Sequence, residues 1–358
     1  MNLDELRNHI DSIDLQIIKL LGARLNLSSQ IGVVKNSQGL DIEDRGRENQ
    51  IITKIKQLAE KEGLNATDAA NIYDIIFKAS KSAQGLAVAF QGEFGAFSEI
   101  AATKIFGTTT RIVPLESLED VFRTVQRGDA PYGVIPVENS LEGSIDTAYN
   151  LLLDSTLTVS GELELKISHC LIANRGASLS SINKIYSHPQ ALGQCQAFIK
   201  HLGCQLIPTY DTAGSVKLIK NEKITDGAAI ASSRAAEIYD MEILASDIQD
   251  NLENYTRFFV ISKKASDPNP LDKTSVIFTV KHEPGALSGI LNAFAVENIN
   301  LTKLESRPTR RKPWEYKFYM DFEGNYRDPG PARALKSANQ YAIFIKILGS
   351  YPKVKERS

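Results

Sequence analysis

A polar turn follows a short apolar run at Gly133–Val137, and its side chains are suited to binding an anionic ligand. Glu138 and Asn139 leave the end of the predicted strand, and Gly143-Ser144 offers the N-cap of a helix beyond it. In open α/β sheets ligands bind at the carboxyl ends of strands, beside helix N-termini that favour anions. An ordinary capped strand-to-helix turn has the same pattern. The turn is therefore a candidate active site, and the neighbouring motifs must distinguish this function from an ordinary structural turn.

Polar clusters end several other apolar runs in this part of the chain. They are GEFGAFS (92–98), SHPQ (187–190), DTAGS (211–215), ASSR (231–234) and NYTRF (254–258). Together with VENSLEGS and HCLIA, and in this order from Val88 to Ile261, they resemble the prephenate dehydratase family. One departure is that Phe94 and Phe97 stand where the family usually has Pro and Tyr, at positions that shape a turn.

The resemblance implies a two-lobed dehydratase and roles for particular residues. Prephenate loses CO2 and its ring hydroxyl together, which calls for a donor to the departing hydroxide and for carboxylate surroundings that do not over-stabilise the anion. By resemblance Thr256 is the donor, Phe258 walls the pocket, and the substrate-contacting positions are Asn139, Ser187 and Gln194. His188 precedes a proline and is interpreted as a turn residue. Glu138 would repel a dianion, so a supporting role is expected.

Composition excludes several other classes of function. The chain has 358 residues and a net charge of −2, so no general attraction to nucleic acid or to an anionic membrane is expected. Three cysteines lack metal-site spacing and are interpreted as free thiols, and no HExxH, GxGxxG or P-loop motif occurs. We expect neither a metal nor a cofactor. No apolar run of about 18 residues and no signal peptide is found, which favours the cytoplasm.

The first 86 residues form a predicted all-helical module. Apolar residues recur at helical spacing from Leu3 to Val34, followed by a second helix capped by Asp44 and a third capped by Thr67. A first helix of that length spans about 50 Å. It cannot bury its apolar stripe against its own short segment, so partner helices from a second subunit are expected.

The polar residues of this module favour an anion pocket. Arg24 and Lys35 share one face of the first helix, whereas Arg7 lies about 100° away from that face. Solvated surface charges would also explain each arginine singly. As a set, these positions resemble the all-helical class of chorismate mutase, in which two chains intertwine and each pocket borrows an arginine at the Arg7 position. The matching residues are Arg7, Arg24, Lys35, Asp44, Arg47, Glu48, Ser80 and Gln84.

That resemblance implies how the pocket works. Chorismate is a dianion that rearranges without proton transfer, so an enzyme can hold its reactive conformer and stabilise charge on the ether oxygen. Arg7, Arg24 and Arg47 would hold the carboxylates. Lys35 and Gln84 would donate to the ether oxygen. Glu48 would bind the substrate hydroxyl, with support from Asp44 and Ser80.

Beyond the helical module the pattern changes to strands alternating with helices, which predicts an α/β domain over residues 87–263. After a polar linker, residues 274–350 read βαββαβ, a ferredoxin-like order. Two motifs there resemble the effector sites of ACT domains, and they comprise Gly285, Ala286, Leu287, Glu305, Ser306, Arg307 and Pro308. The helix start after Gly285 suits a carboxylate, and Glu305 an ammonium group. A plain dimerisation module is the alternative.

Three hypotheses follow for the whole chain. The first is a multidomain, bifunctional enzyme that makes prephenate from chorismate and then phenylpyruvate, inhibited by L-phenylalanine bridging two ACT domains. The fusion of the two domains favours prephenate over arogenate as the second substrate, because the first domain makes prephenate. The second is a dehydratase whose helical module only dimerises. The third is a non-catalytic sensor. A homodimer or higher homo-oligomer is expected, and Glu305→Ala is expected to weaken inhibition while leaving basal activity intact.

Overall fold

The computed structural model describes residues 2–37, 44–108, 110–308 and 316–353. By its internal contacts the chain divides into two compact units. One comprises Met1–Val88 with Ala102–Val113, and the other comprises Ala89–Ala101 with Pro114–Ser358. We describe each unit separately.

The first unit contains the three predicted helices, α1 (Leu3–Ser37), α2 (Arg45–Lys61) and α3 (Ala66–Ala83). The apolar stripe of α1 stays open, with Ile10 57% and Ile17 48% exposed. Asp44 caps α2 as predicted, since its carboxylate accepts the Arg47 N–H at 2.9 Å. The predicted cap of α3 is wrong: Asn65 takes that place, two residues earlier than Thr67. None of the described helices is long and apolar enough to cross a membrane.

The dehydratase-like region has two lobes, each built on one sheet. The first sheet has the strand order β2-β1-β3-β11-β5, with β4 paired to β3. Its elements are β1 (Ala87–Gln91), α4 (Phe97–Phe106), β2 (Arg111–Leu115), α5 (Leu118–Arg127), β3 (Tyr132–Asn139), β4 (Gly143–Ser144), α6 (Asp146–Asp154), β5 (Thr158–Lys166) and β11 (Tyr255–Ser262). The predicted N-cap at Gly143-Ser144 is therefore wrong, because these residues pair with the end of β3 and α6 begins at Asp146.

The second sheet has the order β10-β6-β9-β7-β8. Its elements are β6 (Cys170–Ala173), η1 (Leu179–Ser181), β7 (Lys184–Ser187), α7 (Pro189–Gln194), α8 (Gln196–Leu202), β8 (Gln205–Pro208), α9 (Thr212–Asn221), β9 (Gly227–Ala231), α10 (Ser233–Ile238) and β10 (Glu242–Ala245). Although β5 and β6 are close in the sequence, they belong to different sheets because the chain changes lobe between them. It returns between β10 and β11.

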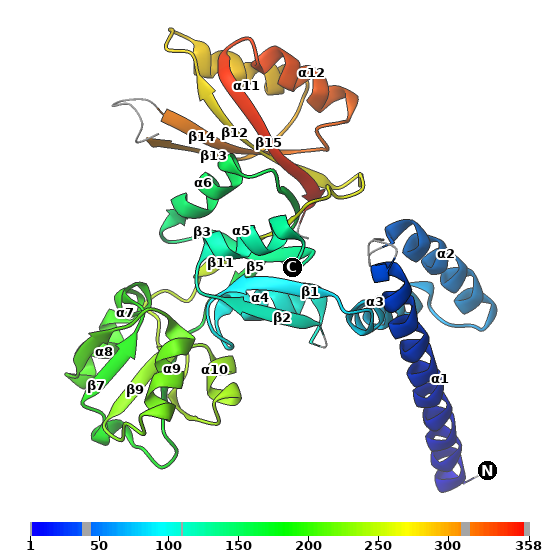
Figure 1. The fold of residues 1–358 in the computed structure, drawn as a ribbon, viewed down its shortest axis with the longest axis vertical. Coiled ribbons are helices and arrows are strands. Elements are labelled where there is room, and N and C mark those ends of the chain that lie inside the picture. The colour runs from blue at the N-terminus through cyan, green and yellow to red at the C-terminus, as the bar shows by residue number, and fades with distance from the viewer. Residues whose placement is uncertain (1, 38–43, 109, 309–315, 354–358) are drawn as a thin grey trace. The chain divides into compact units, whose positions relative to one another are not determined.

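The carboxyl-terminal sheet has the order β13-β14-β12-β15 and confirms the predicted βαββαβ pattern. Its elements are β12 (Asp272–Val280), α11 (Ala286–Val296), β13 (Leu301–Pro308), β14 (Tyr316–Glu323), α12 (Pro329–Ala338) and β15 (Ala342–Pro352). Figure 1 shows α11 and α12 on one face of this sheet. Alternate residues of β14 face opposite ways: Met320 and Phe322 pack with the helices, whereas Tyr319 stacks on Tyr149 of α6.

Candidate active site

A pocket of about 230 Å³ lies between the two lobes. The first sheet and α4 contribute residues including Ser98, Asn139, Thr256 and Phe258, and the second lobe contributes others. The residues from the second lobe are His169, His188, Gln190, Ala191, Gln194, Tyr210, Asp211 and Thr212. Four of the five predicted dehydratase residues, Asn139, Gln194, Thr256 and Phe258, are therefore brought together, although they lie up to 119 positions apart in the chain.

Asn139 and Thr256 face each other across paired strands β3 and β11. The Asn139 amide nitrogen donates to Thr256 Oγ1 at 3.1 Å and to Asn254 Oδ1 at 2.7 Å. Asn139 Oδ1 accepts the N–H of Leu141 at 3.0 Å, which closes the β3–β4 turn. Within the part of the chain that the structure describes, no protein atom accepts the Thr256 hydroxyl hydrogen. That hydrogen can therefore be donated to a ligand in the pocket.

Gln194 is held by three neighbours. Its nitrogen donates to Glu142 Oε1 at 3.0 Å, so its oxygen faces Asn254 Nδ2 and His169 Nε2, both at 3.1 Å. Because that oxygen only accepts, His169 carries its hydrogen on Nε2. Burial lowers the pKa of His169, and its Nδ1 is buried without a protein partner among the described residues. His169 belongs to the HCLIA motif, which by itself indicates no role for this histidine.

The pocket holds little positive charge. None of its lining residues, all within the described chain, is Lys or Arg. The N-termini of α4, at Phe97-Ser98, and of α9, at Thr212, lie at its wall, where backbone N–H groups favour an anion. Burial raises the pKa of the Asp211 carboxyl, although the backbone N–H groups of Gly214 and Ala213 oppose this.

Ser187 differs from the other predicted dehydratase residues. Its side chain is fully buried, and its hydroxyl donates to the Ile230 carbonyl at 2.6 Å. It is not among the residues that line the pocket. The neighbouring His188 caps α7, with its ring nitrogen 3.3 Å from the Gln190 N–H, in agreement with the predicted turn role. Direct contact between Ser187 and substrate stays a prediction that this arrangement does not support.

In the helical unit the structure gathers part of the predicted mutase set. Arg24 contacts the Ser80 hydroxyl and lies 5.7 Å from the centre of the Phe77 ring. Gln84 donates to the Ser80 carbonyl at 3.4 Å. Gly32 lets α1 pack tightly here, because a Cβ at this position would lie 2.6 Å from Gln84 Cα. Glu48 on α2 pairs with Lys81 on α3 at 3.4 Å.

Other predicted mutase residues remain open to solvent. Arg7 is paired only loosely with Asp4, at 3.5 Å, and its side chain is 67% exposed. It lies about 25 Å along α1 from Arg24, too far to share a pocket within one chain. Arg47 and Asp44 are exposed at the start of α2, and Lys35 is half-buried near the end of α1.

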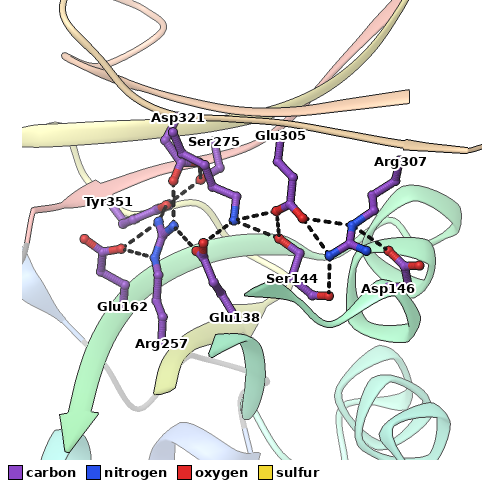
Figure 2. Close-up of polar contacts among 11 residues, drawn as sticks. Glu138, Ser144, Asp146, Glu162, Arg257, Ser275, Glu305, Arg307, Asp321 and Tyr351 are labelled. Atoms are coloured by element: carbon purple, nitrogen blue, oxygen red, sulfur yellow. Dashed lines mark hydrogen bonds and ion pairs between the residues drawn. The ribbon is translucent and has the colours of Figure 1, made fainter. Parts of the chain in front are cut away.

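The predicted effector residues fall into two groups. Gly285, with φ of +84°, precedes α11, which begins with Ala286 and Leu287. In β13, Ser306 and Pro308 are exposed, whereas Glu305 and Arg307 contact the β4–α6 segment. Ser144, Lys303 and Arg307 lower the pKa of Glu305, against the opposing effect of burial. Figure 2 shows these contacts beside an ion-pair cluster around Arg257, a residue to which the sequence motif assigns no role.

Comparisons with known proteins agree with this division. Family models match chorismate mutase type II over residues 6–85, prephenate dehydratase over 88–266 and the ACT domain over 274–338. The bifunctional chorismate mutase/prephenate dehydratase of Aquifex aeolicus (strain VF5) is 39% identical over 359 residues, which cover 98% of each chain. The chain belongs to this family. It is a bifunctional enzyme with mutase, dehydratase and ACT regulatory domains.

Two further relatives match part of the chain. The arogenate dehydratase/prephenate dehydratase 2 of Arabidopsis thaliana is 42% identical over 276 residues, or 74% of this chain and 72% of that protein. The structure of prephenate dehydratase from Arthrobacter aurescens in complex with L-Phe matches with a TM-score of 0.69 and 28% identity. It covers 76% of this chain and 92% of that one.

Proposed function

We propose that Thr256 is the proton donor of the dehydratase step, in which prephenate becomes phenylpyruvate. The observation that supports this most directly is the Asn139–Thr256 hydrogen bond at 3.1 Å. Asn139 donates to the hydroxyl oxygen, which orients the hydroxyl hydrogen away from the strands and polarises the O–H bond. A threonine is a weak acid, so its contribution depends on being held in place as the hydroxide departs.

The low charge of the pocket suits the decarboxylation. A lysine or arginine beside the ring carboxylate would stabilise the substrate anion more than the departing CO2, and would slow the reaction. Backbone N–H groups at the starts of α4 and α9 offer a weaker hold for the carboxylates. Gln194, oriented by His169 and Asn254, has a second amide hydrogen left for the substrate.

The mutase step is assigned to a pocket in the helical module. Arg24 and Gln84 are the residues that the fold already brings together through Ser80. The open stripe of α1 and the remote, exposed Arg7 support an intertwined homodimer, in which the partner completes each pocket. Specific mutase activity is then expected to fall on dilution below the dissociation constant of the dimer, while dehydratase activity per chain persists. The hypothesis that this module only dimerises has less support, because the bifunctional relative from Aquifex aeolicus aligns over 98% of this chain.

L-Phenylalanine is the proposed effector of the ACT domain, since the Arthrobacter aurescens relative was solved with L-Phe. The carboxyl group would meet the start of α11 after Gly285. The Glu305 carboxylate already contacts Ser144, Lys303 and Arg307, so meeting the ammonium group would change these contacts. We therefore expect Glu305→Ala to alter activity without effector as well, unlike the expectation from sequence alone.

One ultraviolet assay tests the two activities and the effector together. Purified protein is given chorismate, and loss of chorismate and appearance of phenylpyruvate are followed with and without L-phenylalanine. Conversion to phenylpyruvate that L-phenylalanine suppresses is the expected result. If supplied prephenate is converted but chorismate is not, the helical module serves only for dimerisation. Supplying arogenate in parallel establishes which of the two acids the pocket prefers.

A further inference from the structure

The face of β3, β4 and β11 that points away from the pocket carries charged residues. In an antiparallel sheet, neighbouring residues along a strand face opposite sides, whereas paired residues share a side. Asn139 and Thr256 are paired across β3 and β11 and lie on the pocket side. The next pair, Glu138 and Arg257, lies on the other side, together with Ser144 of β4, which pairs with Glu138.

The ACT domain binds this second set directly. Lys303 of β13 reaches Glu138 Oε1 at 2.6 Å and Ser144 Oγ at 2.8 Å, so a single ammonium group joins both strands of the β3–β4 hairpin. Arg257 donates to Asp321 Oδ2 of β14 at 2.6 Å and to Tyr351 of β15 at 2.9 Å. Figure 2 shows Asp321 and Tyr351 above Arg257, with Glu162 beside it.

Two more residues of β13 continue the contact. Lys303, Glu305 and Arg307 alternate along the strand and therefore share one face. Glu305 hydrogen-bonds to the Ser144 hydroxyl, and Arg307 lies 3.4 Å from the Ser144 carbonyl oxygen and 3.7 Å from Asp146 at the start of α6. This row therefore holds the hairpin at its second strand as well as its first.

We propose that Lys303, with Glu305 and Arg307, positions the β3–β4 hairpin for the dehydratase reaction, so that the ACT domain helps to set the Asn139 amide against Thr256. A buried ion pair gives little net stability, but it disfavours any displacement that would leave a charge unpaired. The side chains of Lys303 and Arg257 are each only 9% exposed. Sliding of the hairpin would therefore leave these buried charges without their partners. Asn139 lies between the two positions that Lys303 holds.

The inference rests on the proposed role of Asn139 and Thr256, and full-length variants test it. Lys303→Met removes the charge but keeps the stem, Lys303→Arg keeps the charge, and Lys336→Met on the exposed side of α12 is the matched control. Each variant is assayed with supplied prephenate and, in the same preparation, with chorismate. We expect Lys303→Met to lower the dehydratase kcat about tenfold, as small misplacements of reacting groups do. KM and mutase activity should stay near wild type, Lys303→Arg should recover part of the loss, and Lys336→Met should match wild type.

A wild-type dehydratase kcat in Lys303→Met would overturn the inference, while a wild-type protein inactive on prephenate would instead overturn the proposed function. If Lys303→Met loses both activities through misfolding, Ser144→Ala decides, because it removes one hydroxyl. Ser144→Ala should lower kcat about threefold. A Lys303→Arg/Ser144→Ala double variant should lose less than the product of the single effects, since both residues act through one contact. If the losses in kcat multiply fully in the double variant, or if Ser144→Ala loses no activity, the proposed role of Lys303 is contradicted.

Discussion

The two catalytic regions of this chain are built in opposite ways. The dehydratase pocket takes its walls from two lobes of one chain, and among the residues that the structure describes no lysine or arginine lines it. The helical module instead presents arginines about 25 Å apart along an exposed helix. The difference follows the chemistry, because a rearranging dianion needs its carboxylates clamped, whereas a carboxylate that must leave as CO2 is better held weakly.

The largest effect is expected for Arg24→Ala, which removes a proposed carboxylate-binding guanidinium from the proposed mutase pocket. We expect mutase kcat/KM to fall about a thousandfold, at the upper end for loss of one oriented donor. Arg24→Lys keeps the charge and should recover only part, because it lacks the planar fork. Dehydratase turnover with supplied prephenate is the internal control. Equal loss of both activities, or loss of neither, would break the contrast between the two regions.

A change at Asp321 tests the charged face behind the dehydratase pocket. Asp321→Asn leaves Arg257 buried with a weaker partner, which should cost about 3 kcal/mol in the free energy of unfolding measured by urea denaturation. Glu323→Gln, two residues away in a half-buried surface pair with Lys353, is the matched control and should cost under about 1 kcal/mol. Similar values for the two variants would show that the buried cluster contributes no more than a surface pair.

The pH dependence of this cluster has a definite sign. Burial acts to raise the pKa of Asp321, but the charges of Arg257 and Lys273 outweigh it and the pKa is lowered in the folded protein. The folded state then binds fewer protons than the unfolded state, so the stabilisation is complete above the unfolded pKa of about 3.9. It is lost as the pH falls through the lower folded value. The stability difference between wild type and Asp321→Asn should therefore shrink below about pH 4, and a difference that grows there would contradict the assignment.

Thr256→Val replaces the proposed donor by a group of the same shape. Loss of general-acid assistance should lower the dehydratase kcat about a hundredfold, with mutase activity unchanged. Thr256→Ser keeps the hydroxyl and should retain most activity. If the valine variant turns over prephenate at the wild-type rate, the proton comes from another group or from water.

The smallest effect is expected at His169, which orients Gln194. His169→Leu removes one hydrogen bond and should raise the KM for prephenate about fivefold to tenfold. His169→Gln places an amide nitrogen near the Nε2 position and should recover part of the loss. Because this role needs no proton transfer, the pH profile of kcat should match wild type. If His169→Gln instead loses one limb of the pH profile, His169 acts as an acid or base in catalysis.

Much of the architecture follows from local sequence. The helical spacing from Leu3 to Val34 and the Asp44 cap are local patterns, and both appear in the structure as predicted. Local rules failed where pairing partners lie elsewhere in the chain. The sequence predicted a helix cap at Gly143-Ser144, but these residues form a strand because they pair with the end of β3.

The sequence by itself determined the order of the domains and the motifs that carry the chemistry, since short motifs and helical periodicity depend on neighbouring residues. Only the tertiary structure decided which motif residues meet. It placed Asn139 and Thr256 in one hydrogen bond, withdrew Ser187 to the Ile230 carbonyl, and turned Arg257 and Glu305 toward the boundary between the dehydratase and ACT domains. The physical reason is that strand pairing selects which face each side chain occupies, and strand partners far away in the chain leave no local signal.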